Sequence, residues 1–198
     1  MAAKPPFLYV LAAFGLMLGG FGTMYSVSSA VPLMSSRDQY VAANIEQAEA
    51  QLPLADALKP ERDKAIEKQA DALYARRGVT LPLAGMNLIL SFLLFAGCVR
   101  ALRNQQWGHS AWSLAALVSI PYTLLDCGFE VVQHHDLAAA LRSISGPMAA
   151  FTDVGLSWRH FFTMLKGSLE VAYFVTCVLY LKRAPVRALY DGSATAAK

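Results

Sequence analysis

Apolar and polar residues fall into long alternating blocks along this chain of 198 residues. Four largely apolar stretches are each about as long as the roughly 20 residues that a helix needs to cross a bilayer. They predict transmembrane helices over residues 1–31, 81–103, 109–132 and 160–183. Because consecutive spans alternate in direction, the expected fold is an all-α integral membrane protein, a four-transmembrane-helix antiparallel bundle.

The first apolar stretch also has a second interpretation, as a secretory signal peptide. Ser28–Ala30 would provide a cleavage site with small residues, and Lys4 would be its short basic region. The apolar core from Phe7 to Tyr25 is long for the hydrophobic part of a signal peptide. This length favours a retained membrane anchor.

Residues 32–80 are polar and predict an extramembrane, outer helical hairpin between spans one and two. Ser36 followed by Gln39 resembles a capping box, and Pro60 suits the first turn of a second helix. Apolar residues recur at helical spacing in both halves. These two stripes either bury each other or form a docking surface, and the sequence favours neither.

The remaining polar segments are shorter. Residues 133–159 predict an outer loop with a short amphipathic helix carrying Leu137, Leu141 and Ile144. Residues 184–198 predict a cytoplasmic tail. Basic residues follow spans two and four, which places both the N- and C-termini in the cytoplasm.

The closing residues 179–192, LYLKRAPVRALYDG, resemble the C-terminal tails of small bacterial membrane proteins. Together with the many alanines, this resemblance implies a bacterial inner (plasma) membrane.

Composition agrees with a membrane protein and excludes other classes. The chain is 56% hydrophobic and only 16% charged, whereas soluble domains have about a quarter charged residues. A net charge of +3 without a basic cluster argues against nucleic-acid binding. Cys98, Cys127 and Cys177 lie in apolar stretches without a CxxC motif, which argues against a disulfide framework or a zinc knuckle.

Charged residues inside the third and fourth apolar stretches are the main candidates for function. Asp126 and Glu130 share one helix face, as do Lys166 and Glu170, and Asn87 lies at a similar depth in span two. A charge within a span costs roughly 3 kcal/mol on insertion scales. This intramembrane polar cluster is interpreted either as a salt-bridge network that fixes the packing of the spans or as a cation or proton site. A third interpretation is a shallow, wetted surface.

Three histidines and two glycines add weaker signals. His134, His135 and His160 are expected near the outer ends of spans three and four, where paired histidines could ligate haem or a metal ion. Their spacing matches no named motif. Gly15 and Gly19 have the small-xxx-small spacing of helix packing, either within the bundle or between copies.

No catalytic motif is present, neither GxSxG, HExxH, SxxK nor a Walker A loop. The sequence therefore predicts a non-enzymatic protein without a cofactor, most simply an accessory or scaffold subunit of a membrane complex. Its expected partners are the lipid bilayer and other membrane proteins or a second copy, contacted through the outer hairpin. The alternatives are a small transporter or cation- or proton-binding protein that uses the polar cluster and, less favoured, a haem or metal protein.

Overall fold

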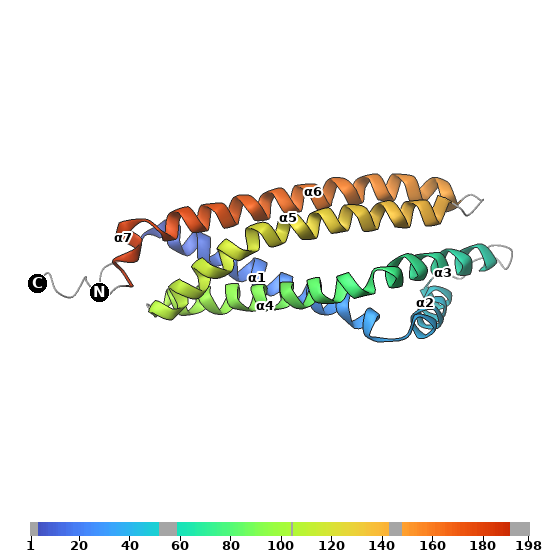
Figure 1. Ribbon diagram of the computed structural model, residues 1–198, viewed down its shortest axis with the longest axis horizontal. Helices are drawn as coiled ribbons and strands as arrows, with labels where there is room; N and C mark the ends of the chain where they lie inside the picture. The colour runs from blue at the N-terminus through green and yellow to red at the C-terminus, as the bar shows by residue number, and fades with distance from the viewer. Residues whose placement is uncertain (1–3, 52–58, 104, 143–147, 191–198) are drawn as a thin grey trace, which may run out of the picture. The chain divides into compact units, whose positions relative to one another are not determined.

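The computed structural model describes residues 4–51, 59–103, 105–142 and 148–190, and in these ranges it is helical without a strand (Figure 1). The helices are α1 (Pro6–Met34), α2 (Arg37–Gln51), α3 (Lys59–Ala75), α4 (Arg77–Leu102), α5 (Gln106–Arg142), α6 (Met148–Leu181) and α7 (Ala184–Arg187).

Four of these helices are long and apolar enough to cross a membrane: α1, α4, α5 and the part of α6 from Ser157 to Leu181. The predicted all-helical chain with four membrane-length helices is thereby confirmed. Only 17% to 28% of their most apolar windows is buried inside the protein. Exposed apolar surface on this scale marks contact with lipid or with other proteins.

The end of α5 differs from the sequence-based expectation. The expected short helix within residues 133–159 is absent as a separate element, because α5 runs on to Arg142 and carries Leu137 and Leu141 with it. Residues 133–142 contain neither glycine nor proline, so nothing ends the helix there. Ile144 and the tail from Asp191 lie outside the described residues.

The predicted helix starts at Ser36 and Pro60 are confirmed. The Ser36 amide donates to the Gln39 side-chain oxygen (3.1 Å), and the Gln39 amide donates to the Ser36 hydroxyl (3.3 Å). This is the reciprocal capping box, which satisfies amides that the first turn of α2 leaves without partners. Pro60 is the second residue of α3, where its missing N–H costs nothing.

The chain divides into two compact units. Unit 1 comprises Met1–Val27, Ala84–Leu125 and Lys166–Lys198. Parts of α1, α4, α5 and α6 share one core there, in which Trp112 is fully buried. A Cβ on Gly97 of α4 would lie 2.7 Å from the Trp112 amide nitrogen, so α4 and α5 meet backbone to backbone at this point.

Side chains close the ends of two helices in unit 1. The carbonyl of Ala101, at the end of α4, accepts hydrogen bonds from the Lys4 ammonium (3.2 Å) and the Tyr190 hydroxyl (3.2 Å). The Leu181 carbonyl, at the end of α6, accepts one from Nε2 of His109 (3.1 Å), whose ring stacks on Tyr190. These donors satisfy carbonyls that the last turn of a helix leaves without partners.

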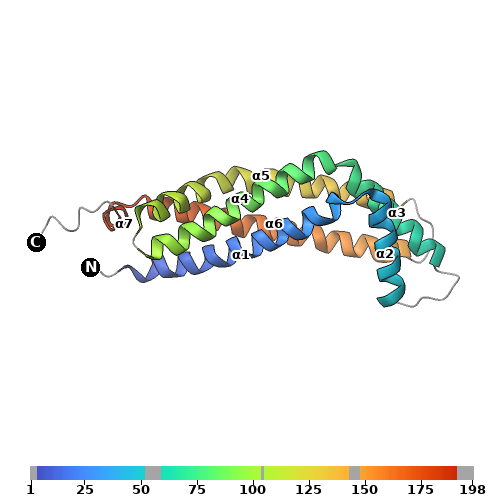
Figure 2. The same ribbon diagram turned by 90° about the horizontal axis from the view of Figure 1, so that it is seen from below.

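Unit 2 comprises Ser28–Leu83 and Asp126–Leu165, and in it α2 contacts α3 (Figure 2). Arg37 pairs with Asp71 (2.7 Å), and the buried Arg62 pairs with Glu49 (3.4 Å). The hydrogen bond to Asp71 raises the pKa of Arg37 above its ordinary value, so the Arg37 guanidinium stays charged throughout the accessible pH range.

The expected hairpin stays a prediction, because residues 52–58, which would join α2 to α3, lie outside the described residues. The antiparallel arrangement of the four spans over their whole length also stays a prediction.

Candidate functional site

A lysine exposed on an apolar helix is the most unusual feature of unit 1. Lys166 lies within the membrane-length part of α6, and its ammonium is 4.8 Å from the centroid of the Tyr25 ring on α1. Phe21 lies one turn before Tyr25 and is 65% exposed, and Leu169 follows Lys166 on α6 and is 63% exposed. We call Phe21, Tyr25, Lys166 and Leu169 the Lys166 face.

Asn87 of α4 lies where α4 packs against α1 in the same unit. Its side-chain oxygen accepts a hydrogen bond from the Ser91 hydroxyl (3.4 Å). Both side chains lie beside Gly22 of α1, where a Cβ would meet Ser91 first and Asn87 at 3.9 Å. A glycine at this position gives two polar side chains room at the contact between the helices.

The predicted polar cluster is divided between the two units. Asn87, Lys166 and Glu170 belong to unit 1, whereas Asp126 and Glu130 belong to unit 2. Asp126, Glu130 and Glu170 are partly buried and each takes part in an interaction. A single cluster that joins all five residues stays a prediction.

Gly15 and Gly19 both contact other helices within unit 1. Gly15 lies against the Tyr173 hydroxyl of α6 and the Cys98 sulfur of α4, and Gly19 lies against Ser91. The Tyr173 hydroxyl lies beside Gly15 and donates a hydrogen bond to the Leu11 carbonyl of α1 (3.0 Å). Sequence reasoning missed Tyr173, although a tyrosine inside an apolar span needs a partner for its hydroxyl.

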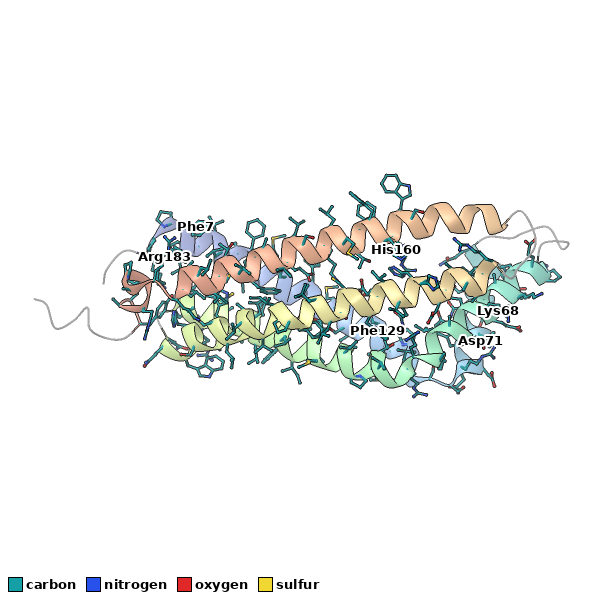
Figure 3. All side chains as sticks on the ribbon, turned by 45° about the horizontal axis from the view of Figure 1, so that its top comes forward. Phe7, Lys68, Asp71, Phe129, His160 and Arg183 are labelled. Atoms are coloured by element: carbon teal, nitrogen blue, oxygen red, sulfur yellow. The ribbon has the colours of Figure 1, made fainter. Side chains whose placement is uncertain are left out.

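The histidines are placed in unit 2 at the contact between α5 and α6. The rings of His134 and His160 meet edge to face, with centroids 5.2 Å apart, and Figure 3 shows His160 on the side of α6 toward α5. His134 is buried, and its Nδ1 has no hydrogen-bond partner among the described residues. His135 is exposed and does not join this pair.

A direct ring contact limits what the histidine pair could bind. The rings of His134 and His160 touch each other as they stand, which leaves no space between them for a flat macrocycle such as haem. In the part of the chain that the structure describes, no three His, Cys, Asp or Glu side chains are grouped so that they could hold a metal ion.

No protein-family model, no curated protein and no solved structure matches this chain. Its function is therefore inferred from its own residues and their contacts.

Proposed function

We propose that this chain is a non-enzymatic accessory or scaffold subunit of a membrane complex and that a partner helix packs on the Lys166 face. One observation carries the proposal. Lys166 is exposed within an apolar, membrane-length helix, and its ammonium lies over the ring of Tyr25.

The energetic argument concerns the environment of this ammonium group. In lipid, a lysine within a span costs roughly 3 kcal/mol on insertion scales. A cation–π contact returns about 2 kcal/mol of this where the charge is desolvated. A carboxylate or a row of carbonyls on a partner helix would offset the remainder. A charge in this position also gives a partner its register, because only one alignment pairs the opposite charge with Lys166.

The α2–α3 pair is proposed to contribute a charged surface rather than an apolar one. Val41 and Ala70 are buried, and the rings of Tyr40 and Tyr74 lie tilted against each other with centroids 5.8 Å apart. None of the described residues from Arg37 to Ala75 is an exposed large apolar side chain. The apolar stripes of α2 and α3 are thus turned inward, which supports mutual burial over an apolar docking surface.

Affinity isolation from native membranes tests this proposal. The tagged chain is extracted in mild detergent, and companion polypeptides, including an untagged second copy, are identified by mass spectrometry. We expect a stoichiometric companion with the wild-type chain and its loss, by about ten-fold or more, with Lys166→Leu. Because leucine suits a lipid-facing position, this variant is expected to fold and insert.

Lys182→Leu is the matched control, since Lys182 is also exposed but follows the end of α6. It should retain the companion. A wild-type chain that runs as a monomer without a companion would refute the proposal, and so would a companion that stays bound to Lys166→Leu.

A further inference from the structure

Unit 1 has a groove of about 390 Å³ between the start of α1 and the end of α6. Its lining consists of four largely apolar or internally bonded side chains and one cation: Phe7, Thr176, Leu179, Tyr180 and Arg183. Figure 3 shows Phe7 and Arg183 at the same end of this unit, next to α7. The groove is separate from the Lys166 face.

The walls of the groove are apolar. Phe7 packs edge to face on Tyr180, with ring centroids 4.9 Å apart, and Leu179 is exposed beside them. The Thr176 hydroxyl donates to the Ala172 carbonyl of its own helix (2.7 Å), so it is already satisfied. A wall of this kind suits a hydrocarbon chain.

Arg183 stands at one end of the groove. Its guanidinium carbon lies 5.7 Å from the Tyr180 ring centroid. The Arg183 carbonyl accepts hydrogen bonds from the amides of Val186 (3.0 Å) and Arg187 (3.0 Å), and Val186 is buried in the core. The backbone that carries the guanidinium is therefore fixed, while the side chain itself remains exposed.

The spacing of these residues matches the layers of a bilayer. Arg183 lies two residues after Leu181, the last residue of a membrane-length helix, where the phosphate groups of a spanned bilayer would lie. Thr176 is seven residues earlier, which is about 10 Å deeper at 1.5 Å per residue. The cation thus lies at the headgroup end of an apolar groove that extends toward the hydrocarbon core.

We propose that this groove binds an anionic phospholipid, with one acyl chain along Thr176 and Leu179 and the phosphate on Arg183. Bilayer lipid is the occupant because the groove is lined by residues of a membrane-length helix, among them the exposed apolar Leu179. Arginine pairs with phosphate through two parallel hydrogen bonds, and the ring of Tyr180 holds the guanidinium in place. The guanidinium of Arg183, together with the exposed Arg187 four residues later, favours an anionic headgroup over a zwitterionic one.

Native mass spectrometry of the delipidated, full-length chain tests the site. Phosphatidylglycerol and phosphatidylcholine with the same acyl chains are added separately, and the bound lipids are counted. We expect one phosphatidylglycerol to bind about ten-fold more tightly than phosphatidylcholine. Arg183→Gln should abolish this preference, and Thr176→Trp should prevent retention of both lipids by filling the groove.

Lys182→Gln is the matched control, an exposed neighbour of Arg183 that does not line the groove. It should leave the preference unchanged. Equal binding of the two lipids by the wild-type chain would overturn the proposal whatever the variants do. Equal losses in Lys182→Gln and Arg183→Gln would indicate a diffuse basic surface, and displacement by glycerol phosphate would indicate a site for free phosphate; either result would also overturn it.

Discussion

Gly19 of α1 and Ser91 of α4 pack backbone against backbone: a Cβ on Gly19 would lie 2.7 Å from the Ser91 carbonyl oxygen. The adjacent Gly20 is different, because a Cβ there would meet nothing within 4 Å. The two neighbouring glycines have the same helix propensity. Comparing an alanine substitution at each of them therefore separates the effect of close packing from that of backbone freedom.

Gly19→Ala is expected to destabilise the protein by about 1–3 kcal/mol, because the Ser91 backbone cannot move aside without shifting α4. Gly20→Ala should leave the stability unchanged or raise it by up to about 1 kcal/mol, because alanine loses less backbone freedom on folding and its Cβ has room. Thermal unfolding of both variants in the same detergent measures the difference. Equal shifts in the two variants would contradict a helix contact at Gly19.

Tyr74 of α3 closes the end of α1 within unit 2. Its hydroxyl donates to the Pro32 carbonyl (2.8 Å) and lies 3.2 Å from the Ser35 carbonyl. Tyr74→Phe is expected to cost about 1 kcal/mol, because a carbonyl at the helix end loses its donor while the ring remains. Hydrogen exchange of the amides in the last turn of α1 should quicken accordingly. Tyr40→Phe is the control, and equal exchange in both variants would show that the Tyr74 hydroxyl has no such role.

The contact between Tyr40 and Tyr74 predicts a loss of stability in alkali. Burial, and then the charge of Tyr74, raise the pKa of Tyr40 above its ordinary value of about 10. The folded protein therefore binds this proton more tightly than the unfolded chain does. The stability that protonated Tyr40 contributes to the fold is fully present below about pH 10, and it is lost as the pH rises through the folded-state pKa of Tyr40.

Unfolding followed from about pH 8 to about pH 11 should show this decline, and Tyr40→Phe should reduce the slope. The measurement is hydrogen exchange or unfolding by denaturant, read from α2 and α3. An unchanged slope in Tyr40→Phe would assign the decline to other groups. Arg37 and Arg62 do not contribute to it, because hydrogen bonds to Asp71 and Asp63 raise their pKa values further.

The features that the sequence predicted well are local ones. A run of apolar residues specifies a membrane-length helix by its own length, as in α1 and α4. The capping box at Ser36 and Gln39 depends on residues three apart, and it forms as expected. The same local logic failed for residues 133–159, where a change from apolar to polar residues was taken for a helix end although α5 continues.

The side that each helix turns inward could not be predicted from periodicity. A span that is apolar all around gives no amphipathic signal, so Lys166 could equally have faced the interior. Its exposed position depends on how α1 and α6 pack, which Gly15 and Tyr173 influence from different helices. The hydrogen bonds that Lys4 and Tyr190 donate to the Ala101 carbonyl likewise join residues about 90 or more positions apart.

His134 provides a last test, which distinguishes a structural residue from a ligand. It is 7% exposed, and its Nδ1 has no hydrogen-bond partner among the described residues. A buried polar atom without a partner costs about 1–3 kcal/mol. His134→Phe keeps an aromatic ring against His160 and removes this atom, so we expect a gain of about 1 kcal/mol in thermal unfolding. The exposed His135→Phe should stay within about 0.5 kcal/mol of the wild type.

The opposite result would have a specific meaning. If His134 instead donates electrons to a metal ion or to haem, His134→Phe removes a bond that stabilises the folded chain, and stability falls rather than rises. Metal analysis and visible absorption of protein from metal-replete cells, measured for the wild type and His134→Phe, then identify the bound group. A loss of stability without a loss of metal or colour would mean that His134 serves packing through its contact with His160.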